Sequence, residues 1–467
     1  MLHEVKKNQD SKGTNYIEPV YARKDFGSGL PKFELGEEGL NADAAYDLVH
    51  DELMLDGNAR LNLATFVTTW MEPQAEKLMT ESFDKNLIDK DEYPAATRIE
   101  ERCINIISKL YNAPETGIGA SGIGSSEAVM LAGMALKWRW KQKMEAAGKS
   151  TAKPNLILGS NVQVVWEKFC RYWEVEPRYI KMAPGRYTIN GEEVMKQVDE
   201  NTIGVVAILG VTYTGEYEPV GEVHDALMKH KEKTGHEVPL HIDAASGGFI
   251  APFLQPDLEW DFRLPLVKSI NVSGHKYGLV YPGIGWVVWR SKEDLPEDLV
   301  FHVNYLGGDF PTFTLNFSRP ANQVIAQYYN FVRLGRKGYT DVQRNSQQVA
   351  MYLSGKIAEM DDFELLSDGS DTPVFAFRSS NEKVLSVYDV SDRLREKGWL
   401  IPAYTMPEDV QDMSVLRIVV REGLSHDLAE ALLEDLAWAV EKCKMGQQVP
   451  RQSETGTDSS TAGKLKC

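Results

Sequence analysis

Two reactive side chains follow apolar, strand-like segments in the middle of the sequence. Asp243 ends the run 239–243, and small residues follow it, among them Ala245. Lys276 lies in Ser-Gly-His-Lys, directly after the apolar run 269–272. Open α/β sheets bind ligands at the carboxyl ends of their strands. We therefore expect Asp243 and Lys276 to lie in one site.

A lysine and a carboxylate on neighbouring strand ends suit a site for pyridoxal phosphate (PLP). The lysine amine forms a Schiff base, and the carboxylate keeps the pyridine nitrogen protonated, which makes the ring an electron sink. The small side chain of Ala245 leaves room for a flat ring. An ordinary ion pair between Asp243 and Lys276 is the alternative that these residues alone leave open.

A glycine-rich stretch at 122–126 leads into a helix that we expect at 127–147. Free backbone N–H groups and the positive end of a helix dipole favour an anion such as a phosphate. Ser125 and Ser126 add hydroxyl groups at this point. Ser125 is also a candidate helix cap, and the two roles are compatible.

Two motifs fit well-known signatures but lack the required context. Residues 117–122 fit G-x-G-x-x-G, but no convincing strand precedes them and no acidic residue follows about 20 positions on, so a nicotinamide site is not expected. Residues 273–276 fit S-x-x-K, but the S-D-N motif of penicillin-recognising serine enzymes is absent.

The length suggests about three domains or one large enzyme subunit, and the composition is typical of a globular protein. The chain has 467 residues and a net charge of −17, which repels phosphate backbones and anionic lipids, so neither nucleic acid nor a membrane is an expected partner. Four dispersed cysteines indicate no disulfide framework and no metal site, and they suit the cytoplasm. No apolar run approaches the roughly 18 residues that span a bilayer.

Strand-like and helical segments alternate through the middle of the chain. This pattern predicts an α/β large domain with a mostly parallel sheet, and a second α+β pattern follows it. The expected domains are an N-terminal arm with helices at 1–60, a large cofactor-binding domain at 61–345, a small C-terminal domain at 346–445 and a flexible tail at 446–467.

Several phrases in order resemble one family, the glutamate decarboxylases of the PLP-dependent group II decarboxylases, of plant and bacterial type. They lie at 61–66, 88–94, 124–127, 241–245, 272–276 and 316–318, and the resemblance covers roughly residues 40–440. It implies fold type I of PLP-dependent enzymes, which is aspartate aminotransferase-like. It also implies that L-glutamate is converted to 4-aminobutyrate (GABA) and CO2, with one proton consumed per turnover.

The resemblance implies a role for each residue of the cofactor site. Lys276 would be the Schiff-base lysine, and Asp243 would pair with the pyridinium nitrogen. The remaining expected cofactor-binding residues are Ser125, Ser126, Gln163, Thr212, Ala245, Ser273 and His275, with Ser318 reaching the phosphate from a neighbouring subunit.

The resemblance also implies a substrate site. Thr65 and Phe66 would receive the side-chain carboxylate of glutamate, and Asn86 and Asp89 would join them from the partner subunit. Arg421 would bind the α-carboxylate through its bidentate fork, with Arg417 as the alternative. Tyr305 is the candidate proton donor to Cα, with Lys276 second.

A shared site makes a homodimer the minimum assembly, and a hexamer is a further option. A decarboxylase for another substrate is a rival hypothesis that Gln163, Thr65 and Arg421 argue against. A non-catalytic scaffold is another, and the presence of Lys276 and Asp243 argues against it.

The last residues carry two further expectations. The tail 446–467 has no tryptophan and only three cationic residues, so we expect no calmodulin binding. Its Lys464 and Cys467 can both attack a Schiff base, so the tail is a candidate autoinhibitory plug.

Overall fold

The computed structural model describes residues 32–36, 39–115, 117–304 and 310–445. The chain divides between Asn58 and Ala59 into two compact units, which are described separately here. In the first unit, α1 spans Ala42–Leu53 and begins at Asn41, whose side chain accepts a hydrogen bond from the Ala44 N–H at 2.9 Å. The helical pattern of residues 41–53 predicts this helix. Most of the expected arm and the whole tail 446–467 lie outside the described residues.

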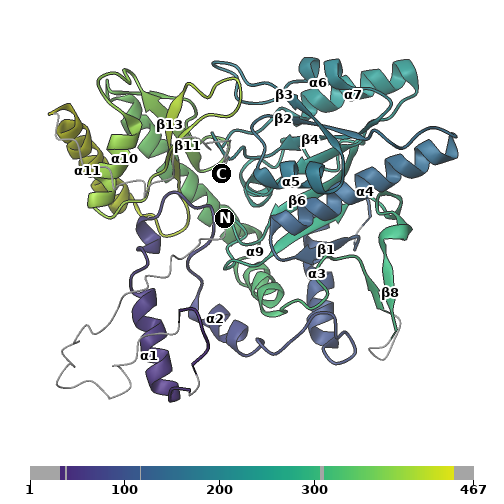
Figure 1. Ribbon diagram of the computed structural model, residues 1–467, viewed down its shortest axis with the longest axis horizontal. Coiled ribbons are helices and arrows are strands. Elements are labelled where there is room, and N and C mark those ends of the chain that lie inside the picture. The colour runs from purple at the N-terminus through teal and green to yellow at the C-terminus, as the bar shows by residue number, and fades with distance from the viewer. Residues whose placement is uncertain (1–31, 37–38, 116, 305–309, 446–467) are drawn as a thin grey trace. The chain divides into compact units, whose positions relative to one another are not determined.

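A seven-stranded sheet organises the second unit, in the order β1-β7-β6-β5-β4-β2-β3 (Figure 1). Strands β3, β2, β4, β5 and β6 run parallel, and β7 pairs antiparallel with both β6 and β1. The strands are β1 Gly119–Gly122, β2 Asn155–Gly159, β3 Glu176–Ile180, β4 Thr202–Ile208, β5 Leu240–Asp243, β6 Val267–Ser273 and β7 Gly285–Trp289. The prediction of a mostly parallel sheet is confirmed.

Helices cover both faces of this sheet because its strands are apolar on both sides. In β4, Val205 and Ala207 belong to one hydrophobic core, and Val206 and Ile208 belong to another. Alternate residues of a strand point to opposite faces, so the two cores lie on the two sides of the sheet. The helices of this region are α2 Pro73–Thr80, α3 Pro94–Leu110, α4 Ser125–Ala146, α5 Val164–Tyr172, α6 Gly191–Gln197, α7 Val220–Thr234 and α8 Ala251–Leu254.

A smaller antiparallel sheet follows, in the order β10-β11-β13-β12, and a third core packs against it. Its elements are β10 Phe363–Leu365, β11 Val374–Ser379, α10 Val387–Glu396, β12 Ala403–Thr405, β13 Ser414–Val419 and α11 His426–Lys444. The expected domain boundary near residue 345 falls inside the long helix α9, Asn322–Ala358, which kinks earlier, at Gly335. A short hairpin, β8 Phe301–Val303 with β9 Phe310–Thr312, precedes α9.

Other expectations can be compared with the described residues. The motif at 117–122 contains β1 itself, and β1 sits at the sheet edge, so the motif does not form a strand-to-helix dinucleotide turn. None of the helices described here is both long and apolar enough to cross a membrane.

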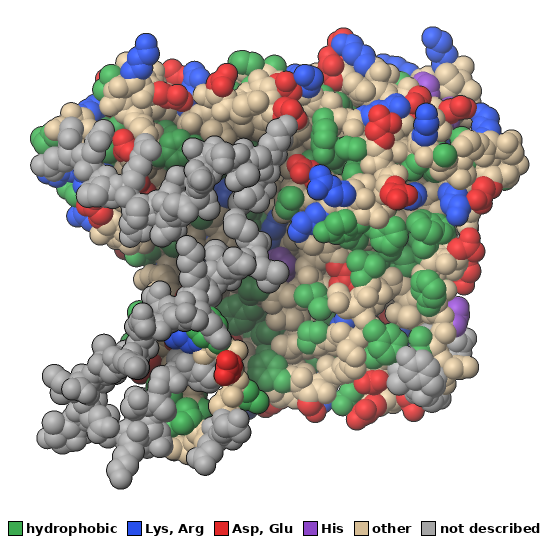
Figure 2. Space-filling model, in the orientation of Figure 1, with side chains coloured by type: hydrophobic (Ala, Val, Ile, Leu, Met, Phe, Trp, Pro, Cys, Tyr) green, Lys and Arg blue, Asp and Glu red, His purple; other side chains and the backbone are tan. Residues whose placement is uncertain are grey.

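Figure 2 shows acidic and basic side chains interspersed over the visible face rather than gathered into a field of one sign.

Candidate active site

The ends of β5 and β6 hold a buried carboxylate in a fixed orientation. Asp243 pairs in register with Asn271 on the neighbouring strand and is 5% exposed. Its Oδ1 accepts from Asn271 Nδ2 at 3.0 Å and from the Ala245 N–H at 3.2 Å. Its Oδ2 accepts from the indole N–H of Trp166 at 2.9 Å. Three N–H donors on three elements therefore fix the plane of this carboxylate.

A neutral histidine lies behind this carboxylate and orients Asn271. The Nε2 of His241 is 2.8 Å from Asn271 Oδ1, and its Nδ1 is 2.7 Å from Ser269 Oγ. Burial lowers the pKa of His241 to about 4. The ring is therefore uncharged at neutral pH and can donate to the Asn271 oxygen, which turns the amide N–H groups of Asn271 towards Asp243.

Lys276 lies on the turn after β6 with its amine in a buried, weakly polar environment. Its Nζ is 3.3 Å from Ser246 Oγ and 5.1 Å from the centre of the Phe66 ring. Burial lowers the pKa of Lys276 to about 8, although Asp243 raises it; Arg417 lowers it further. No ion pair within 4.0 Å joins Lys276 to Asp243, both of which the structure describes. The simple ion-pair alternative is therefore not realised.

The glycine-rich loop before α4 forms the second part of the site. Gly124 has φ +95° and precedes the helix, and a Cβ built on it would lie 2.8 Å from His275 Cε1. A side chain at Gly124 would be both strained and in the way of the His275 ring. Ser125 is the first residue of α4 rather than its cap, and its Oγ is 2.6 Å from Ser273 Oγ. Ser126, one position further on, is exposed.

His275 contributes a neutral ring to this loop. Its Nδ1 accepts from the backbone N–H groups of Gly283 and Ile284, each at 3.2 Å. Burial, together with the charge of Lys276, lowers the pKa of His275 to about 4. We assign the ring proton to Nε2 because Nδ1 is occupied as an acceptor. The ring thus has one N–H donor left for an anion.

A segment from the start of the second unit covers the lysine. Thr68 donates from its backbone N–H to the His275 carbonyl at 2.9 Å and from Oγ1 to the Lys276 carbonyl at 2.6 Å. These two bonds bring the predicted substrate residue Phe66 over the lysine amine. The hydroxyl of Thr65, the other predicted residue here, accepts from the Val67 N–H at 3.1 Å.

The two candidate arginines have different surroundings, and these favour Arg417. The guanidinium of Arg421 makes four hydrogen bonds, to the carbonyls of Ala59, Asn62 and Val67 and to Thr69 Oγ1, at 2.7–3.2 Å. Both of its terminal nitrogens are thus saturated by one loop. The role of Arg421 towards a substrate carboxylate stays a prediction.

Arg417 lies in the electrostatic environment of Lys276. Its guanidinium carbon is 4.8 Å from the centre of the Phe66 ring, on which Lys276 also lies. Each terminal nitrogen donates once, to the Thr212 and Ala64 carbonyls at 2.7 Å, and Nε has no partner among the described residues. One N–H on each terminal nitrogen therefore remains for a ligand.

The other predicted residues lie as follows. Gln163 caps α5 through its Oε1, which accepts from the Val165 N–H at 2.6 Å, and its side chain is exposed. Thr212 and Ala245 are half-buried beside the residues already described. Asp89 is half-buried, and its backbone N–H donates to the Asn86 carbonyl at 3.2 Å. Tyr305 lies outside the described residues.

Asn86 and Ser318 form a pair of their own. Asn86 Nδ2 donates to Ser318 Oγ at 3.3 Å, and its Oδ1 accepts from the Arg319 N–H at 3.0 Å. The structure describes no hydrogen bond from either side chain to Ser125 or His275. Asn86 and Ser318 therefore contact each other, and neither side chain is hydrogen-bonded to the phosphate loop of its own chain.

Sequence reasoning missed three supports of the site: Trp166, Asn271 and Ser246. Trp166 follows Gln163 by three positions, so one helical turn would have placed it beside Gln163. The pairing of Asn271 with Asp243 depends on the order and register of β5 and β6, which no local pattern reveals. Within the described chain no group of three or more His, Cys, Asp or Glu residues could hold a metal ion.

The residues present fit PLP. A buried lysine with a lowered pKa provides an amine that is readily deprotonated, and a fixed carboxylate faces the same site. The Gly124 loop, with Ser125, Ser273 and the free N–H of His275, provides donors for a phosphate at a helix start. The fold and the site together define a PLP-dependent enzyme of fold type I.

Residues 37–380 match the family model for the pyridoxal-dependent decarboxylase conserved domain. This chain belongs to the pyridoxal-dependent decarboxylase family.

Similar proteins are found in plants and bacteria. Glutamate decarboxylase 2 of Arabidopsis thaliana is 54% identical over 412 residues, covering 87% of this chain and 83% of that protein. Glutamate decarboxylase of Aliivibrio fischeri is 51% identical over 430 residues, covering 91% and 92%. The solved structure of Lactobacillus brevis glutamate decarboxylase, 43% identical, matches with a TM-score of 0.88 over 91% of this chain and 98% of that one.

Proposed function

We propose that this protein is an enzyme that decarboxylates L-glutamate to GABA and CO2, with PLP as its cofactor. One proton is consumed per turnover, because CO2 leaves and Cα is protonated in its place. The observation that carries the proposal is the lysine amine of Lys276, buried at the end of β6 and sharing its site with the fixed carboxylate of Asp243. The similarity to glutamate decarboxylases over most of the chain supports glutamate as the substrate.

The residues around Lys276 have separate tasks in this reaction. Bound PLP supplies an electron sink for the bond to the departing carboxylate. Lys276 holds the cofactor through its amine, and Asp243, fixed by Trp166 and Asn271, accepts the N–H of the pyridine ring. Two of the proposed phosphate ligands are Ser273, which is buried, and Ser125, whose hydroxyl contacts that of Ser273.

The substrate is bound through its two carboxylates. We assign the α-carboxylate to Arg417, because Arg417 lies near Lys276 and has N–H groups to offer. The side-chain carboxylate goes to Thr65 and Phe66. The proton for Cα would come from Tyr305, with Lys276 as the second candidate.

A second copy of the chain completes each site. Asn86 and Ser318 lie on one edge together with exposed apolar side chains: Phe83 is 66% exposed, Leu315 51% and Phe317 40%. Such a patch favours association. A homodimer in the cytoplasm is the minimum assembly, with a hexamer as an option. Asp89 then joins the substrate site of the second copy, and a plug by 446–467 stays a prediction.

The test is a Lys276→Ala variant assayed for CO2 release from L-glutamate, with Lys337→Ala as the control. Lys337 is 88% exposed, so its loss should leave turnover unchanged. Lys276→Ala should lose turnover and the visible absorbance of lysine-bound PLP while keeping its circular dichroism spectrum. Full turnover in Lys276→Ala would contradict the assignment. Preference for another amino acid in a substrate panel would contradict glutamate alone.

A further inference from the structure

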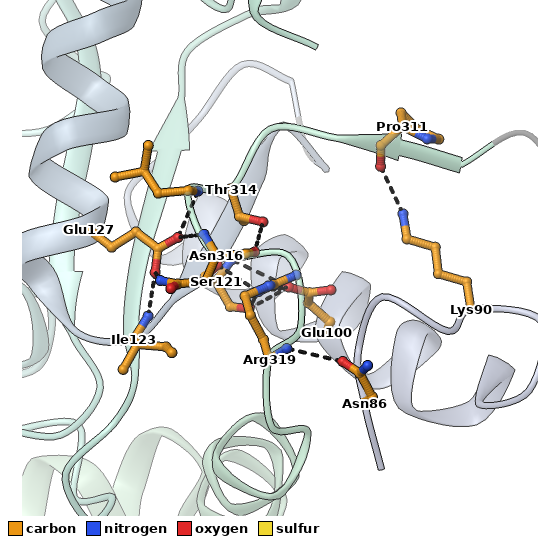
Figure 3. A network of polar contacts seen from close by, with 11 residues as sticks. Asn86, Lys90, Glu100, Ser121, Ile123, Glu127, Pro311, Thr314, Asn316 and Arg319 are labelled. Atoms are coloured by element: carbon orange, nitrogen blue, oxygen red, sulfur yellow. Dashed lines mark hydrogen bonds and ion pairs between the residues drawn. The ribbon is translucent and has the colours of Figure 1, made fainter. Parts of the chain in front are cut away.

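A buried set of polar contacts lies next to the phosphate loop and has no task in the chemistry above (Figure 3). Its charged members are Glu100, Glu127 and Arg319, which are 8%, 6% and 9% exposed. Burying a charge is costly unless it is paired and hydrogen-bonded. The contacts of these three residues therefore show which segments the buried charges hold together.

Glu127 joins two segments that are far apart in the sequence. Its Oε2 accepts from the Ile123 N–H and from Asn316 Nδ2, each at 2.8 Å. Its Oε1 accepts from the Leu315 N–H at 2.9 Å and from the Asn316 N–H at 3.2 Å. One carboxylate is thus shared between the phosphate loop, through Ile123, and the segment that carries Ser318. Its position in the first turn of α4 also suits the helix dipole.

Arg319 fixes the other end of the same segment. Its guanidinium donates to the Ser121 carbonyl at 2.7 Å and to Glu100 Oε1 at 3.2 Å. Its backbone carbonyl accepts from the Leu87 N–H at 2.9 Å, and its N–H donates to Asn86 Oδ1 at 3.0 Å. Ser318 lies in the chain between Asn316, which Glu127 holds, and Arg319. Figure 3 shows the contact of Glu127 with Asn316 and those of Arg319 with Glu100 and Asn86.

Few apolar contacts hold the stretch 315–318 in place. Leu315 and Phe317 are 51% and 40% exposed, and Asn316 and Ser318 are exposed as well. A segment with little buried apolar surface opens at low cost unless specific hydrogen bonds close it. The bonds to Glu127 therefore control much of its order.

We propose that Glu127 is a positioning residue that couples occupancy of the phosphate loop to the order of residues 314–319. A phosphate bound to the backbone N–H groups that begin α4 fixes the loop, including Ile123. Fixing Ile123 fixes the Glu127 carboxylate, whose other contacts then hold Leu315 and Asn316. Coupling between binding events is reciprocal, so a second copy that covers this edge should in turn tighten cofactor binding. The inference rests on the proposed cofactor and on the proposed second copy.

The test measures hydrogen exchange of the peptide amides at 310–320 in the full-length protein, without cofactor and after adding PLP. In the wild type, PLP should slow exchange of the amides of Leu315 and Asn316 by about tenfold, within the usual range of coupling between sites. In Glu127→Gln the slowing of exchange should be lost. The substitution replaces one carboxylate oxygen, which accepts hydrogen bonds, by an amide NH2 group, which cannot accept them from the facing N–H groups. PLP binding itself is followed separately by its absorbance on Lys276.

Glu145→Gln is the matched control: it makes the same change on the same helix, at a side chain that is 55% exposed and pairs with Lys141. The control should keep the tenfold slowing. Equal slowing in Glu127→Gln and in the control would overturn the proposal.

If Glu127→Gln does not fold, Asn316→Ala decides, because it removes one donor to Glu127 from an exposed residue. Unchanged slowing in Asn316→Ala would overturn the proposal, and loss of slowing would support it. A wild type that binds no PLP would count against the proposed function. A wild type that binds PLP without slower exchange at 314–319 would count against this inference alone.

Discussion

Replacing each of the two arginines near the substrate site by lysine should separate recognition from structural support. Lysine keeps the positive charge but loses the planar fork and its five N–H donors. Arg417 and Arg421 stand four residues apart, on β13 and just beyond it, so the two variants form a matched pair. The structure predicts opposite outcomes for them.

Arg421→Lys should mainly lower stability. The guanidinium makes four hydrogen bonds to the loop 59–69, and a single ammonium on a shorter reach can replace about two of them. At about 1 kcal/mol net for each bond lost, the variant should lose about 2 kcal/mol of unfolding free energy. Its KM for glutamate should change little once the protein is folded.

Arg417→Lys should mainly lower activity. Lysine keeps the charge but loses the fork, and a lost hydrogen bond to a charged ligand group costs about 1.5–3 kcal/mol, which corresponds to about 10- to 160-fold in kcat/KM. Only two bonds to carbonyls, of Thr212 and Ala64, are at stake for stability. The loss of stability should therefore be smaller than in Arg421→Lys.

Two measurements on the same preparations test this reasoning: steady-state decarboxylation of glutamate and unfolding in guanidinium chloride. The expected result is a large loss of kcat/KM for Arg417→Lys and a large loss of stability for Arg421→Lys. If Arg421→Lys lost about 100-fold in kcat/KM at unchanged stability while Arg417→Lys stayed active, Arg421 would be the α-carboxylate ligand after all.

Three further perturbations have defined outcomes. Burial lowers the pKa of Lys276 to about 8 in the folded chain, so the charged amine destabilises the fold fully below pH 8, and this effect is relieved as the pH rises towards 10.5. Cofactor-free Lys276→Met should therefore melt at a higher temperature than cofactor-free wild type at pH 7. The difference in melting temperature should shrink by pH 10. Gly124→Ala places a Cβ against His275 at a positive φ, so PLP titrations should show cofactor affinity at least tenfold weaker, and unchanged affinity would contradict the close approach. Trp166→Phe removes one donor from the buried carboxylate of Asp243 and should cost about 1.5–3 kcal/mol in chemical unfolding, whereas a neutral result would mean that this bond is of no consequence.

Much of the fold could be predicted because local patterns carry it. The apolar run at 155–159 predicts a strand with the bounds that β2 has, and the helical pattern at 220–235 predicts α7, Val220–Thr234. The helical pattern at 72–86 predicts one continuous helix, but α2 covers only Pro73–Thr80, because the residues that follow form turns that hold Asn86 and Ser318 together. Such a long-range contact leaves no trace in local periodicity.

Motifs identified the candidate site residues but not their support. Lys276, Asp243 and the glycine-rich loop are recognisable because strand ends and helix starts have sequence signatures. The sequence allows Ser125 to be both a helix cap and a phosphate ligand, and the structure shows that Gly124 occupies the cap position. Tyr305 stays a prediction from resemblance.

Sequence motifs alone predict the reactive groups of this protein: a lysine, a carboxylate and a phosphate loop, each at the end of a regular element. The tertiary structure decided which neighbours tune that chemistry. It engaged the terminal nitrogens of Arg421 with one loop, placed Asn271 beside Asp243, and joined Glu127 to Asn316. The physical reason is that reactive groups are marked by the local geometry of strand ends and helix starts, whereas their partners are set by strand order and by packing between distant segments.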